Sequence, residues 1–197
     1  MTLRDVDLHV RVNALHVITE IDKTGIFEDE DEASRLKIGR LVFDSEPKIR
    51  KAVGGFVRGL WEQRVDAMKA EWSAAKGQKR KRAGKVTDEE MESRFGYKAL
   101  ATLLLETARA VDEAERQEAE SSRQAEYNHS AQAGRATAAV EALWDAFEEL
   151  EQWEDLVEYL LLDHSGGDDM WLLDEEEESL LLQVLVACIK QDDRVSL

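Results

Sequence analysis

The stretch DSEPKIRKAVGGFV, residues 44–57, repeats the spacing of an earlier part of the chain. In both places an Asp is followed by four residues, then by a β-branched residue and an arginine: Asp44 precedes Ile49-Arg50 as Asp5 precedes Val10-Arg11. In a repeated helical unit the Asp would end one helix and cap the next. The Val or Ile would enter the core, and the Arg would reach back to an acid of the adjacent turn.

The composition predicts a chain that is helical nearly throughout. It has 197 residues, with eleven glycines and a single proline. Ala, Leu, Glu, Lys and Arg dominate, and these residues lose little side-chain freedom in a helix. The length is sufficient for one domain with a sizeable core.

Apolar spacing and capping residues divide the chain into expected helices. Gly25 is placed to end the first, Asp44-Ser45 caps the third with Pro47 in its first turn, and Thr87 with Glu90 forms a capping box. We expect helices over about residues 3–21, 30–43, 46–75, 87–119 with a bend near position 96, 132–150, 151–162 and 174–190.

Two residue types indicate how these helices pack. Gly54, Gly55 and Gly59 lie inside the third expected helix, where each glycine costs about 1 kcal/mol relative to alanine. We therefore expect another helix to approach closely there. Trp61 and Trp144 lie on apolar stripes and are expected in the core.

Helix pairs that echo after about 40 residues are typical of HEAT and armadillo arrays, in which each pair must stack on its neighbours. The sequence therefore predicts an all-α fold, an α-solenoid of HEAT-like antiparallel helix pairs. Residues 1–197 would form one segment of three to four pairs, with a basic flexible loop at 76–86 and a polar link at about 120–131. The alternative is an irregular helical bundle.

Charge is distributed unevenly. The net charge is −17, which argues against a nucleic-acid binder, yet residues 46–98 hold 14 basic and 8 acidic side chains. Residues 141–193 hold 18 acids and one base, Lys190. Opposite poles on one chain indicate separate faces with separate partners.

Several stretches taken in order resemble the stromalin family, the HEAT-repeat subunit of cohesin. They are RDVDLHVRVNALHVITEI at 4–21, LKIGRLVFDSEPKIRKAVGGFVRGLW at 36–61, EALWDAFEELEQWEDLVEYLL at 141–161 and EEESLLLQVLVACIKQ at 176–191. The resemblance is to the part that follows the stromalin conservative domain. The segments at 62–95 and 112–135 depart from it and are most like fungal versions.

The resemblance implies an internal piece of a longer, hook-shaped solenoid with no catalytic activity. Such a scaffold in the nucleus, on chromatin, would support sister-chromatid cohesion and chromatin organisation. Its implied partners are the kleisin subunit, double-stranded DNA contacted without sequence preference, and further cohesin regulators.

The candidate DNA-binding residues form a stripe and a run. Lys48, Arg50, Lys51 and Arg58 share one expected helix, and the run Lys79, Arg80, Lys81 and Arg82 follows in the basic loop. Such cations neutralise phosphates without reading bases. Alternatively, Arg50 is structural, the other stripe cations are solvated, and the basic run is a nuclear-import-like signal or an uncommitted loop.

Trp153 and Trp171 adjoin acids and expected helix ends, so either is a candidate anchor for a partner peptide, with burial between helix pairs as the alternative. The acids at 168–169 and 174–178 lack the spacing of a calcium-binding loop. Their position before an expected helix predicts a solvated helix N-terminus. A helical protein-interaction module without nucleic-acid binding remains the second functional reading.

Enzymatic readings find no support in the motifs. The four histidines are scattered without metal-ligand spacing, and no phosphate-binding loop or nucleophile elbow occurs. Cys188 is the only cysteine, which excludes an intrachain disulfide and fits a reducing compartment. We expect no enzyme activity, no cofactor, no metal, no small-molecule substrate and no membrane span.

Overall fold

The computed structural model describes residues 7–25, 32–76, 87–121, 130–165 and 169–195, and nearly all of these are helical. No strand occurs among them, which confirms the predicted all-α class. The helices are α1 (Leu8–Asp22), α2 (Glu32–Gly39), η2 (Arg40–Phe43), α3 (Pro47–Lys76), α4 (Asp88–Ser121), α5 (Ser130–Leu143), η3 (Trp144–Ala146), α6 (Glu148–Glu151), α7 (Trp153–Leu160) and α8 (Glu175–Val195).

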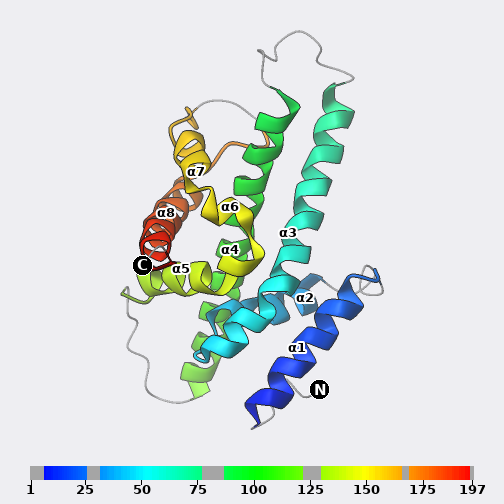
Figure 1. Ribbon diagram of the computed structural model, residues 1–197, viewed down its shortest axis with the longest axis vertical. Coiled ribbons are helices and arrows are strands. Elements are labelled where there is room, and N and C mark those ends of the chain that lie inside the picture. Colours follow the sequence, from blue (N-terminus) through cyan, green and yellow to red (C-terminus); the bar gives the residue numbers. More distant parts are fainter. Residues whose placement is uncertain (1–6, 26–31, 77–86, 122–129, 166–168, 196–197) are drawn as a thin grey trace.

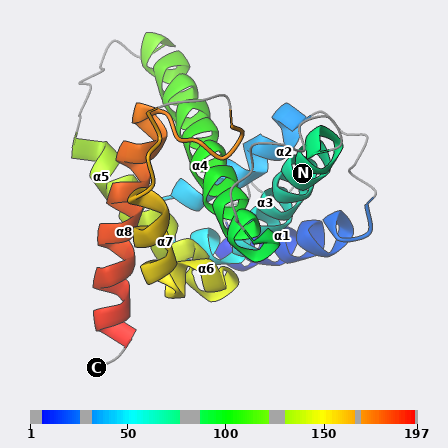
Figure 2. The same cartoon turned by 90° about the horizontal axis from the view of Figure 1, so that it is seen from above.

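The helices pack in two rows. In the first row α1 contacts α3, α3 contacts α5 and α5 contacts α8, whereas in the second row α2 contacts α4 and α4 contacts α7. The long helices α3 and α4 run side by side in opposite directions (Figure 1). Seen from above, α1 and α8 lie on opposite sides of the molecule (Figure 2). If the short helices α2 and α7 are counted, the order α1, α2, α3, α4, α5, α7, α8 alternates between the two rows.

Glycines in α3 allow its neighbours in the first row to approach from two sides. A Cβ added to Gly54 would lie 3.0 Å from the carbonyl oxygen of Ala142 in α5. A Cβ added to Gly59 would lie 3.1 Å from Oδ2 of Asp22 in α1. The prediction that these glycines permit close helix packing is confirmed.

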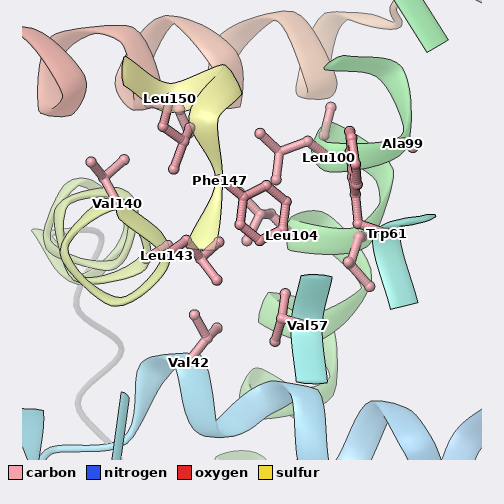
Figure 3. Close-up of a cluster of buried hydrophobic side chains, with 14 of the residues drawn as sticks. Val42, Val57, Trp61, Ala99, Leu100, Leu104, Val140, Leu143, Phe147 and Leu150 are labelled. Carbon is pink, nitrogen blue, oxygen red and sulfur yellow. The ribbon is translucent and has the colours of Figure 1, made fainter. Parts of the chain in front are cut away.

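The core is continuous between the rows, and Phe147 lies at its centre (Figure 3). Phe147 contacts the ring of Trp61 edge-on, with 5.4 Å between centroids. Trp61 and Trp144 are both 7% exposed, as their apolar stripes predicted. Trp61 also donates a 2.7 Å hydrogen bond from its indole nitrogen to the carbonyl oxygen of Gly96 in α4.

The predicted single helix over 132–150 is wrong. α5 ends at Leu143, and Phe147 takes an extended conformation with φ −128° and ψ 98°. This break turns the chain so that Phe147 points into the core while α6 and α7 return over α4. The hydroxyl of Tyr97 on α4 lies 3.2 Å from the carbonyl oxygen of Glu149 and 3.3 Å from that of Gln152, so it satisfies backbone acceptors at the turn.

Most predicted helix boundaries are close to the observed ones. Gly25 has a positive φ of 76°. Thr87 and Glu90 form the reciprocal capping box, in which the Thr87 amide donates to the Glu90 carboxylate and the Glu90 amide to the Thr87 hydroxyl. The Glu46 amide donates to Asp44 Oδ1 at 2.9 Å, and α3 begins at Pro47. The capping box at Thr87 and the helix end at Gly25 are therefore confirmed, whereas Asp44 orders the turn before α3, and the first backbone bonds of that helix are accepted by the Glu46 carbonyl.

Other boundaries differ. The second predicted helix is α2 followed by the 3-10 turn η2, and α8 extends past Lys190 to Val195. α4 runs through Gly96, where a bend was predicted, as one helix. The glycine leaves room for the Trp61 ring, since a Cβ added there would lie 3.2 Å from that ring. α4 and α5 also extend into the predicted polar link, and residues 77–86 of the basic loop lie outside the described part of the chain.

Candidate nucleic-acid interface

The repeated Asp-x4-(Val/Ile)-Arg unit is most complete in its second copy. Asp44 accepts from the Glu46 amide in the turn before α3, and Ile49 is fully buried. Arg50 reaches back to the carbonyl oxygens of Asp44 and Ser45, at 3.1 and 3.2 Å. The arginine thus reaches back as expected, but to backbone oxygens of the preceding turn.

The first copy differs from the second in several respects. The N-cap of α1 is Asp7, whose side chain accepts from the His9 amide, and not the predicted Asp5. Asp5 lies outside the described residues, and Val10 is exposed at 37%, so the expectation that this position enters the core is wrong. Val10 lies on the face of α1 that points away from α3, because the buried residues of α1, including Leu15 and Ile18, lie on the other side. Arg11 instead bonds Asp44 of the second copy at 2.6 Å.

Arginine–acid pairs link each pair of neighbours in the first row. Arg11 of α1 bonds Asp44, which lies in the turn before α3. Arg50 of α3 pairs with Glu141 of α5 at 3.5 Å, and Arg194 of α8 pairs with the same carboxylate at 2.8 Å. The first row is therefore joined along its length by a ladder of ion pairs, which we call the arginine ladder.

Of the predicted DNA-binding stripe, Arg58 has the most internal contacts. Its guanidinium pairs with Glu149 at 2.6 Å and with Glu62 at 2.9 Å, and lies 4.3 Å from the ring centroid of Trp61. Burial disfavours the charged guanidinium, but the hydrogen bonds that it donates to the Glu62 and Glu149 carboxylates outweigh this, so the pKa of Arg58 is raised. These contacts hold α3 against the turn between α5 and α7.

The lysines of the stripe are more accessible. Lys48 is exposed in the first turn of α3. Lys51 pairs with Asp145 at 2.9 Å, with both side chains more than half exposed, at 64% and 72%. Such a pair is worth little in water, and a phosphate would readily replace the aspartate. Lys79, Arg80, Lys81 and Arg82, the predicted basic run, lie outside the described residues.

An open pocket of about 260 Å³ lies where α3, α5 and α8 meet. The pocket is lined by the basic side chains of Arg50, Lys51 and Arg194, together with Glu141 and the α3 residue Pro47. The structure thus brings together two of the predicted stripe residues and one arginine from the other end of the chain. Arg194 was not predicted, since it lies 144 positions from Arg50 and no local pattern connects them.

Acidic side chains surround the stripe. Glu141, Asp145 and Glu149 come from the acidic half of the chain and pair with Arg50, Lys51 and Arg58. The two charge poles predicted from the sequence therefore meet here, and much of the positive charge is neutralised within the chain. Among the described residues of the stripe, Lys48 is the cation without an acidic partner, whereas the pocket cations Arg50, Lys51 and Arg194 are all paired.

The two candidate anchor tryptophans are both half-buried. Trp153 packs against the core. Trp171 lies edge-on to the His164 ring, with 5.8 Å between centroids, and the Arg94 guanidinium lies 4.8 Å from the centroid of its ring. His164 in turn accepts a 3.2 Å hydrogen bond from the Leu173 amide at Nδ1, which orders the connection between α7 and α8. Both tryptophans therefore have structural contacts.

The acidic start of α8 forms a cap, and the expectation that it is solvated is wrong for Glu177, which is buried. Asp174 accepts from the Glu177 amide, and Glu177 accepts from the Asp174 amide, both at 2.8 Å. Glu177 is 5% exposed and also pairs with Lys98 of α4. Within the described ranges, no three or more metal-ligating side chains gather into a potential metal site, and none of the helices there is both long and apolar enough to cross a membrane.

Comparisons of the chain with protein-family models, with curated proteins and with solved structures found no significant match.

Proposed function

We propose that the chain is a segment of a HEAT-like α-solenoid that acts as a non-catalytic scaffold in the cohesin complex. The assignment to cohesin rests on the sequence resemblance to the stromalin family. It places the chain in the nucleus, on chromatin, where the scaffold would bind the kleisin subunit and double-stranded DNA in support of sister-chromatid cohesion and chromatin organisation.

The observation that carries the solenoid is the arginine ladder within the two-row packing. Arg11–Asp44, Arg50–Glu141 and Arg194–Glu141 each join neighbouring helices of the first row. In a stack of helix pairs, each unit contacts mainly its neighbours, so a polar link repeated at each junction sets the register of the stack. An irregular bundle has no reason to repeat such a link.

The DNA-binding part of the proposal rests on Lys48, on the readily exchanged Lys51–Asp145 pair and on the basic run at 79–82. Because Arg50 and Arg58 have internal partners, we assign them to holding the surface together. Phosphate contacts then come from the lysines and the loop, and depend steeply on salt.

The test is fluorescence anisotropy of labelled duplex DNA at several salt concentrations. Lys48→Glu/Lys51→Glu is compared with Lys37→Glu/Lys190→Glu, which makes the same charge change at exposed lysines of α2 and α8. A second variant replaces Lys79, Arg80, Lys81 and Arg82 by Gln. We expect Lys48→Glu/Lys51→Glu and the variant of the basic run to weaken binding at least about tenfold and to reduce the salt slope, and Lys37→Glu/Lys190→Glu to bind nearly as the parent does.

A second candidate function is a helical protein-interaction module without nucleic-acid binding. The intramolecular pairing of Arg50, Lys51 and Arg58 with acids favours it. If the chain is such a module, the parent chain should not bind duplex DNA even at low salt. Capture of the purified kleisin subunit by the chain tests the protein partner separately, and failure there together with failure on DNA would refute the cohesin proposal.

A further inference from the structure

Helix α8 carries apolar side chains on two opposite faces. Its inner face, which packs against α5, α4 and α7, includes Leu181, Val184 and Cys188, each 0% exposed. Its outer side carries Leu182, Val186 and Ile189, which are 51%, 51% and 39% exposed. These three residues follow at spacings of four and three, so they form one stripe along the helix, which we call the outer stripe.

An outer stripe of this kind is unusual for a helix at the surface. A surface helix normally buries one apolar face and turns charged residues to water. Single exposed apolar residues are common, but three in register on one helix face mark an interaction surface. α8 lies at one edge of the molecule, so solvent reaches this face (Figure 2).

The packing of the first row indicates the shape of the occupant. α3 has α1 on one side and α5 on the other, and α5 lies between α3 and α8. α1 and α8 lie at the two ends of the row, so each has a second side that no described residue covers. On α8 this side carries three apolar residues at the three- and four-residue spacing that fits between the ridges of another helix. The outer stripe is thus shaped for a helix.

The charges around the outer stripe indicate the chemistry of the occupant. Glu175 lies seven residues before Leu182 and Asp193 seven residues after Val186, so an acid extends the stripe at each end. Glu178 lies four residues before Leu182, and Lys190 is the single base beside the stripe. A helix with basic residues beside its apolar positions would complement this surface.

We propose that the outer stripe of α8 docks an amphipathic helix of a partner protein that carries lysine or arginine residues beside its apolar stripe. This inference is independent of the proposed function, since it requires neither DNA nor kleisin. It also assigns a role to the acidic end of the chain, which attracts the basic helix to the apolar surface.

The test uses synthetic peptides of about 18 residues, long enough to form a marginal helix in water. The probe has leucines at alternating three- and four-residue spacings flanked by lysines. One control has the same composition in scrambled order, and another replaces the flanking lysines by glutamates. Binding to the full chain is measured by anisotropy of a fluorophore on the peptide, with folding of every variant checked by circular dichroism.

We expect the basic amphipathic peptide to bind at micromolar concentration and each control peptide at least about tenfold more weakly. Leu182→Ser/Val186→Ser should weaken binding by at least about tenfold. The matched control Val17→Ser, at a residue 57% exposed on α1, should leave it unchanged. Equal binding of the scrambled peptide, or unchanged binding by the stripe variant, would overturn the proposal.

Sedimentation of the chain alone addresses the competing occupant, a second copy. The proposal is wrong if three results occur together: the chain self-associates, Leu182→Ser/Val186→Ser abolishes the self-association, and the basic peptide does not compete with it. The outer stripe would then serve self-association. A monomeric chain that binds the basic peptide through the outer stripe supports it.

Discussion

Arg11 and Asp44 lie 33 residues apart in the sequence and are joined by a 2.6 Å hydrogen bond between Nη2 and Oδ2. Both side chains are largely shielded from water, at 21% and 13% exposed. The other oxygen of Asp44 accepts from the Glu46 amide. One carboxylate therefore orders the turn before α3 and also ties α1 to it, so its replacement has two separable effects.

Asp44→Ala removes both the hydrogen bond from the Glu46 amide and the ion pair with Arg11, and should lower the free energy of unfolding by about 2 kcal/mol. Asp44→Asn keeps an oxygen that accepts from the Glu46 amide and should cost about half as much. Urea denaturation followed by circular dichroism gives both values, and the double variant with Arg11→Ala gives the coupling, expected near 1 kcal/mol. Additive losses would show that the pair contributes nothing to stability.

Gly54→Ala should destabilise the chain even though alanine is the better helix former. The new Cβ would meet the Ala142 carbonyl oxygen at 3.0 Å, and a backbone atom cannot move without shifting α5. The matched control is Gly134→Ala in α5, where no atom lies within 4 Å of the added Cβ. That change should stabilise by about 0.5–1 kcal/mol. Thermal melts of the two variants should therefore move in opposite directions.

Arg58→Lys should lower the unfolding free energy by about 1–2 kcal/mol, because lysine cannot pair with Glu62 and Glu149 while covering the Trp61 ring. Lys51→Gln serves as the comparison, since its pair with Asp145 is exposed and should be worth less than about 0.5 kcal/mol. Equal effects of the two changes in urea denaturation would contradict an internal role for Arg58.

Stability should fall at alkaline pH. Burial raises the pKa of Cys188 from 9.0 to about 12, and burial also raises the pKa values of Tyr97 and Tyr159 above their ordinary 10.0. These raised pKa values mean that the folded chain keeps protons that the unfolded chain releases. The stabilisation is complete below pH 9 and is lost as pH rises toward 12.

The measurement is urea denaturation at steps between pH 7 and 11. Each of the three groups should contribute a slope of at most about 1.4 kcal/mol per pH unit once its unfolded form ionises. Tyr159→Phe should reduce the slope above pH 10, where the unfolded tyrosine would ionise. A stability that stays constant to pH 11 would show that these groups are accessible to water in the folded chain.

The helices, their caps and the all-α class follow from local patterns. Gly25, Asp44 with Pro47, and Thr87 with Glu90 act through neighbours in the sequence, so their roles could be predicted from spacing alone. The close approach at Gly54 could also be predicted, because a helix-destabilising residue inside a helix requires a packing reason.

The other features of the fold and of the candidate site depend on packing between segments that are far apart in the sequence. The break of α5 after Leu143 carries no glycine or proline, and it arises because Phe147 must point into the core. In the candidate site, composition identified the cations of α3, but which of them are free depends on Glu141, Asp145 and Glu149, about ninety positions away. The sequence alone determined which segments are helical, because capping and apolar spacing are local. Only the tertiary structure decided which charges are paired and which apolar face of α8 stays open, because both depend on contacts between distant segments.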